Sequence, residues 1–68
     1  MEMHTLLALA RTVMKWTKNP DLEVIIATTE YSYHRWGDTS DASALVTAIH
    51  AALIFDRYNR PATAVTLF

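Results

Sequence analysis

Few side chains in this sequence are suited to catalysis or metal binding, and they are far apart. The three histidines, His4, His34 and His50, are the only residues suited to proton transfer at neutral pH, and none has a metal-binding spacing such as His-x-x-x-His. Asp38 and Asp41 are three residues apart at a predicted helix start. They could coordinate a cation, but capping of that helix is sufficient to explain them. One glycine and no cysteine exclude a glycine-rich phosphate loop and a thiolate metal site. We therefore expect no enzyme activity, no metal and no cofactor.

The richest group of recognition residues is Tyr31, Tyr33, Arg35 and Trp36. On a β-strand, the two tyrosines and the arginine share one face, and Trp36 lies on the other. Such residues dominate protein–protein hot spots, can stack single-stranded bases on an open sheet, and can also simply cover a small core. Residues 21–41 carry five acidic residues against one arginine, which disfavours binding to phosphates. We predict that the four residues bind a protein partner, with single-stranded nucleic acid as the alternative.

The element expected to present these residues is a long β-strand over Leu22–Trp36. The stretch is rich in β-branched and aromatic residues, contains no glycine or proline, and is followed by Gly37. Residues 24–27 are apolar on both faces, as in a covered strand. The stretch is long for a strand, so we expect either a bulge or a hairpin near residues 28–30. A strand that projects past its own sheet favours pairing with a second copy of the chain.

Residues 2–18 are predicted to form an amphipathic helix that ends at Asn19-Pro20, with Leu9 and Trp16 on its flank. Its apolar face comprises Met3, Leu6, Leu7, Ala10, Val13 and Met14. Another stripe of the helix comprises His4, Arg11, Lys15 and Lys18. We expect this basic stripe to be solvated or paired with the acidic residues 21–41, since charged stripes usually face water. The alternative is that it binds an acidic partner or nucleic acid.

A second helix is predicted from Thr39 or Ser40 to about Asn59, with Pro61 ending it. Its apolar residues cover more than half of the circumference, so we expect burial on two sides. One face is expected to lie on a sheet: Leu45, Val46, Ile49 and Leu53. An adjacent alanine-rich face allows close approach to another helix, either the first helix or its copy in a partner. The residues expected at a dimer interface are Ala48, Ala52, Ile54 and Phe55.

In the last residues, Ala62–Phe68, the side chains would alternate between two faces of a strand, and we predict a short edge strand there. The predicted fold is therefore one small two-layer α+β domain over residues 1–68, with helices on one face of a short sheet. The element order is α-β-α-β, or α-β-β-α-β if the long strand folds back. Because two strands are too few for a stable sheet, we expect dimerisation to complete it.

The chain has 68 residues, a hydrophobic fraction of 51% and a net charge of −1. So short a chain has little interior, and we expect part of its apolar surface to face another chain. The small net charge gives no overall attraction to nucleic acid or membrane, and no apolar run approaches the roughly 20 residues of a bilayer span. The lack of cysteine, and Glu2 and His4 where a signal peptide carries cations, favour the cytoplasm.

These features favour a non-enzymatic interaction module, a cytoplasmic homodimer that binds a larger protein and modulates or inhibits it. Small accessory or inhibitor proteins of phages and mobile elements share its size, lack of cysteine and high apolar content. The runner-up is a single-stranded nucleic-acid-binding module that uses residues 31–35. The third hypothesis is a small-ligand binder or enzyme whose site two subunits build together. The sequence leaves the identity of the partner and the biological process open.

Overall fold

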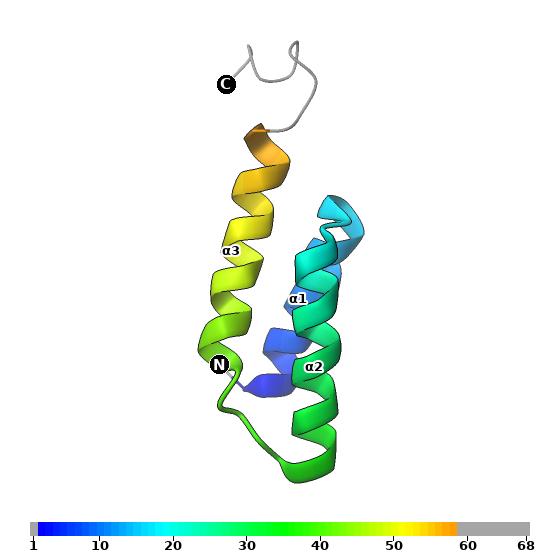
Figure 1. The fold of residues 1–68 in the computed structure, drawn as a ribbon, viewed down its shortest axis with the longest axis vertical. Coiled ribbons are helices and arrows are strands. Elements are labelled where there is room, and N and C mark those ends of the chain that lie inside the picture. Colours follow the sequence, from blue (N-terminus) through cyan, green and yellow to red (C-terminus); the bar gives the residue numbers. More distant parts are fainter. Residues whose placement is uncertain (1, 59–68) are drawn as a thin grey trace.

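The computed structural model describes residues 2–58, which form three α-helices and no strand (Figure 1). Helix α1 spans Met3–Thr17, α2 spans Pro20–Trp36 and α3 spans Ala42–Tyr58. Each helix packs against the other two, and α2 runs antiparallel to both neighbours. The C-terminal end of α3 extends past the α1–α2 turn, and the C-terminal end of α2 extends past the start of α1 (Figure 1). The bundle therefore carries a projecting helix end at each pole.

The stretch predicted as a long strand, Leu22–Trp36, is helical and belongs to α2, so that prediction was wrong. Leu22, Ile26 and Thr29 are buried, and Tyr33 is half-buried beside them. These positions follow the i, i+4, i+7, i+11 spacing of one helix face. Each β-branched residue costs only about 0.5 kcal/mol in helix propensity, whereas full burial of one Leu or Ile contributes about 1.5–3 kcal/mol. Packing therefore outweighs the local preference for a strand.

Both ends of α2 carry residues that mark helix termini. The Asn19 Oδ1 accepts the backbone N–H of Asp21 at 2.9 Å, and Pro20 occupies the first helical position. At the other end, Gly37 has a φ of 67°, and its N–H donates to the Tyr33 carbonyl at 2.8 Å. The proline that ends α1 thus also begins the next helix, and the single glycine closes it.

One apolar core fills the space between the three helices. Ten hydrophobic residues are almost fully buried: Met3, Leu6, Leu7, Ala10, Val13, Leu22, Ile26, Leu45, Ile49 and Ala52. Each helix contributes one leucine that is less than 2% exposed. The predicted apolar face of the first helix is confirmed, because five of its six residues belong to this core and Met14 packs against it.

The fold is an all-α three-helix bundle, and the predicted α+β class was wrong. Residues 2–58 hold no sheet that the helices could cover or that a dimer could extend. The α3 face assigned to a sheet is divided, because Leu45 and Ile49 lie in the core whereas Val46 and Leu53 are exposed. The strand predicted at Ala62–Phe68 lies outside the described residues.

Candidate interaction site

Three of the four predicted partner-binding residues meet at the C-terminal end of α2. Tyr31 and Arg35 are one turn apart on the same helix face, and Trp36 is the last residue of the helix. The Arg35 guanidinium carbon lies 6.0 Å from the centre of the Tyr31 ring and 5.4 Å from that of the Trp36 ring. The two rings meet edge to face, with their centres 5.6 Å apart. We call Tyr31, Arg35 and Trp36 the aromatic corner.

The aromatic corner is open to solvent. Tyr31 is 60% exposed and Trp36 is 65% exposed, on the helix end that projects from the bundle. A cation over an exposed ring contributes about 0.5–1 kcal/mol, which restrains Arg35 before any partner binds. Glu30 and His34 complete a shallow surface hollow with Tyr31 and Arg35. The corner therefore offers two adjacent aromatic rings and one guanidinium, the residue types that carry most binding energy at protein interfaces.

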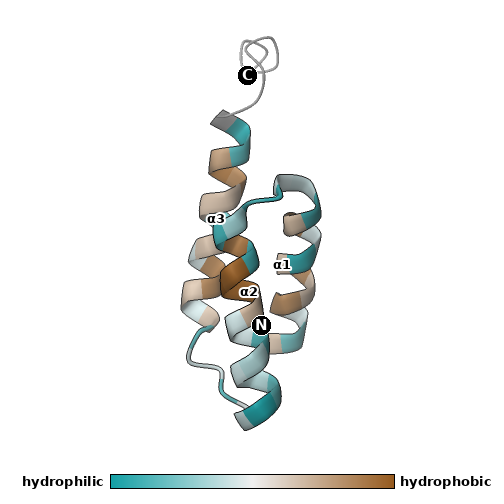
Figure 2. Cartoon of the chain, turned by 45° about the vertical axis from the view of Figure 1, so that its right-hand side comes forward, coloured by the Kyte–Doolittle hydropathy of each residue, from teal (hydrophilic) through white to brown (hydrophobic). Residues whose placement is uncertain are grey.

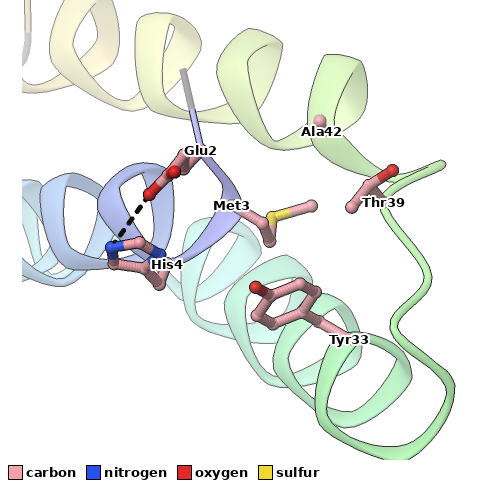
Figure 3. Close-up of a pocket in the computed structure, with 6 residues that line it drawn as sticks. All are labelled: Glu2, Met3, His4, Tyr33, Thr39 and Ala42. Atoms are coloured by element: carbon pink, nitrogen blue, oxygen red, sulfur yellow. Dashed lines mark ion pairs between the residues drawn. The ribbon is translucent and has the colours of Figure 1, made fainter.

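Tyr33 lies on a different face of α2 from Tyr31 and Arg35. It is half-buried and packs against the core. With Met3, Thr39 and Ala42 it lines a depression where the start of α1, the end of α2 and the start of α3 meet (Figure 3). Its ring thus closes one end of the core. The shared face predicted for Tyr31, Tyr33 and Arg35 on a strand does not form.

The titratable side chains at this depression include Glu2 and His4. At its rim, His4 Nε2 lies 3.3 Å from Glu2 Oε2, and both side chains are largely exposed (Figure 3). The pKa of Asp38 is lowered, chiefly because its carboxylate accepts the backbone N–H of Ser40 at 2.8 Å. That bond shapes the turn before α3. Across residues 2–58, no three His, Asp, Glu or Cys side chains gather closely enough to hold a metal ion.

The residues predicted at a dimer interface are divided between the core and the surface. Ala52 is 1% exposed and Ala48 is half-buried against the core, so both take part in the packing of the chain's own helices. Ile54 and Phe55 are exposed near the C-terminal end of α3. Figure 2 shows hydrophobic colouring in these last turns of α3. Of the four residues, Ile54 and Phe55 are the two that another chain can readily reach.

A further apolar surface was not recognised from the sequence. Leu9 and Trp16 of α1 and Val46 and Leu53 of α3 are all exposed. The members of each pair are seven residues apart, which is two turns, so each pair lies along one helix face. Arg11 of α1 contacts α2, and Leu9 and Trp16 lie on the opposite flank of α1. The signal that could have found this surface is the seven-residue spacing of large apolar residues outside the core face.

Comparison with known proteins adds no relative. No known protein family, curated protein or solved structure matches the sequence. Within residues 2–58, no helix is both long enough and apolar enough to cross a bilayer. The inference of function therefore rests on the packing and the surface of the three helices.

Proposed function

We propose that this protein is a non-enzymatic interaction module, a homodimer that binds a larger protein through the aromatic corner and thereby modulates or inhibits it. The observation that supports the proposal is how the large apolar side chains are divided between the core and the surface. Within residues 2–58, nine large apolar side chains are exposed, whereas eight side chains larger than alanine form the core. Several of the exposed ones are grouped rather than scattered, and grouped apolar surface is typical of interaction sites.

The aromatic corner is the best candidate for the partner-binding surface because its geometry is already set. Tyr31, Arg35 and Trp36 contact one another in the free chain, so little side-chain entropy is lost on binding. A partner surface with a carboxylate beside an apolar pocket would match the guanidinium and the two rings. Occupying a surface of the partner is sufficient for inhibition and needs no catalytic group.

The charge around the corner favours a protein over a nucleic acid. Glu30 lies beside Tyr31 in the same hollow, and residues 21–41 carry a net charge of −4, from five acidic residues and one arginine. Binding to nucleic acid depends on the number of phosphates that cations neutralise, and this corner has a single arginine. Single-stranded nucleic acid is therefore the competing outcome of the test below.

The test is affinity capture from the native host with the full-length protein, in nuclease-treated extract, followed by mass spectrometry and titration of the captured protein. Arg35→Ala and Trp36→Ala should each weaken binding of that protein at least about thirtyfold, since truncating a hot-spot residue costs about 2 kcal/mol or more. Val24→Ala is the matched control, because Val24 is an exposed residue on the same helix outside the corner. Circular dichroism should show unchanged helix content in all three variants.

A labelled single-stranded oligonucleotide provides the opposing measurement. We expect no binding at low salt. Binding that falls steeply as salt is raised, and that Arg35→Ala abolishes, would replace the proposal with the nucleic-acid alternative. Equal capture of the same protein by the wild type and by Trp36→Ala would show that the corner is not the binding site.

A further inference from the structure

We propose that a second copy of this chain packs in antiparallel orientation on the α1–α3 stripe, the surface formed by Leu9 and Trp16 of α1 and by Val46 and Leu53 of α3. This inference rests on the proposed homodimer, because it names where the two copies meet. It does not depend on the aromatic corner, which lies on α2.

The two apolar pairs lie beside the same seam. Successive residues of a right-handed helix advance by about 100°, so the flank of α1 opposite Arg11 is the flank next to α3. The same rotation places Val46 and Leu53 on the edge of α3 nearest α1, next to buried Ile49. α1 and α3 run in the same direction and pack against each other. The four side chains therefore form one surface.

The pairs are also level with each other. Met3 and Ala42 line the same depression, so α1 and α3 start at nearly the same height (Figure 3). From these positions, Leu9 is about 9 Å and Val46 about 6 Å along the helix, at 1.5 Å per residue. From the same starting positions, Trp16 lies about 20 Å along α1 and Leu53 about 17 Å along α3. The stripe thus has a lower rung, Leu9 with Val46, and an upper rung, Trp16 with Leu53.

The two rungs are separated by the same seven residues on α1 and on α3, and this arrangement fits a two-fold axis. Antiparallel copies place the upper rung of each chain on the lower rung of the other, so that every contact is made twice. Trp16, which is 69% exposed in the single chain, would then be covered by Leu9 of the second copy.

The available area is sufficient for a small dimer. α3 has 17 residues and α1 has 15, which correspond to a face about 25 Å long and two helix diameters, about 20 Å, wide. Such a face covers about 500 Å² per copy, or about 1,000 Å² in total, which is near the lower bound for a specific interface. The charged residues of α1, Arg11 and Lys15, lie on its other flank, away from Leu9 and Trp16.

The first measurement is sedimentation equilibrium of the 68-residue chain at micromolar concentration. We expect twice the monomer mass of 7.7 kDa. Trp16→Glu should raise the dissociation constant of the dimer at least tenfold and leave helix content unchanged, because the side chain is mostly in solvent within one chain. Val24→Glu introduces the same charge at an exposed position of α2 and should leave the dimer intact.

The second measurement tests the orientation. The chain has no cysteine, so Leu9→Cys and Trp16→Cys chains each carry one thiol. When unlabelled Leu9→Cys chains are mixed with ¹⁵N-labelled Trp16→Cys chains and oxidised, mass spectrometry should show mainly the mixed disulfide. Predominance of either self-disulfide would overturn the antiparallel arrangement.

A monomer at all measured concentrations would overturn the proposal itself. In that case, Trp36→Phe leaves Trp16 as the only tryptophan. Protection of its fluorescence from a soluble quencher in a monomer would show that the chain covers its own stripe. A dimer that persists in Trp16→Glu would place the interface elsewhere. Corner variants that lose partner binding but remain dimeric would show that the dimer contact and the partner-binding surface are separate.

Discussion

Arg11 of α1 donates a hydrogen bond to the Glu30 carboxylate of α2, and this ion pair bridges the two helices. The two residues are 19 positions apart, so the bond joins two antiparallel helices that are distant in the sequence. It also explains one feature of the charge pattern, because the basic stripe of α1 does pair, through Arg11, with the acidic middle of the chain. The pair lies at the surface, with the arginine side chain 48% exposed.

Removing this pair should have a small effect that depends on salt. Arg11→Ala should lower the free energy of unfolding by about 0.2–1 kcal/mol, because solvent screens a surface ion pair. A double-mutant cycle with Glu30→Ala, measured by urea denaturation, isolates the coupling energy. That energy should shrink when salt is raised. Lys15→Ala is the control, since residues 2–58 show no ion pair for it; equal losses for Arg11→Ala and Lys15→Ala would contradict the assignment.

A buried hydroxyl offers a stabilising substitution. Thr29 is fully buried in α2, and its Oγ1 has no hydrogen-bond partner among the described residues. An unsatisfied buried polar group costs about 1–3 kcal/mol, and valine has nearly the shape of threonine and a similar helix propensity. Thr29→Val should therefore raise the free energy of unfolding by about 1 kcal/mol in urea denaturation. Thr29→Ser, which keeps the hydroxyl and loses a methyl group, should lower it, and a less stable Thr29→Val would show that the hydroxyl is in fact bonded.

Close packing at Ala52 predicts a strong response to added volume. Ala52→Leu should destabilise the bundle by about 1–3 kcal/mol, because the new side chain would enter a filled core. Ala51→Leu, one position along the same helix and exposed, should change the free energy of unfolding by less than about 0.5 kcal/mol. Thermal denaturation followed by circular dichroism measures both. A tolerated Ala52→Leu would mean that α3 packs less tightly on its neighbours than its burial indicates.

The first and last helices could be predicted from the sequence, and the middle one could not. The apolar residues of α1 recur at helical spacing without β-branched neighbours, so periodicity and propensity agree. In α2 the two signals conflict, since residues 24–29 favour a strand locally while Leu22, Ile26 and Thr29 align on a helix face. Asn19-Pro20 predicts the end of α1, but a capping residue followed by proline also predicts the start of a helix.

The candidate site was located by residue type, and its arrangement depended on the secondary structure. Tyr31, Arg35 and Trp36 meet because a helix brings positions four and five apart together, whereas a strand would have separated Trp36 from the other two. Tyr33 was grouped with them by the period of a strand and instead packs against the core. The α1–α3 stripe depends on the mutual rotation of two helices, which requires knowledge of which flank faces α2. No pattern within a single helix carries that information.

Two residues within residues 2–58 adopt a left-handed backbone, Gly37 with a φ of 67° and Lys18 with a φ of 51°. Both follow a helix. The N–H of Gly37 donates to the carbonyl of Tyr33, and the N–H of Lys18 donates to the carbonyl of Met14, in each case four residues earlier.

A Cβ at Gly37 would meet nothing within 4 Å, so Gly37→Ala should be destabilising through backbone strain alone, by about 1 kcal/mol. Lys18→Gly should have the opposite sign, because it relieves the same strain, and the gain should stay below about 1 kcal/mol since glycine adds entropy to the unfolded chain. Gly37→Asn should be milder than Gly37→Ala, as asparagine tolerates this conformation. Urea denaturation of the three variants at one salt concentration measures the differences, and destabilisation of equal size in Gly37→Ala and Lys18→Gly would show that strain does not govern the ends of α1 and α2.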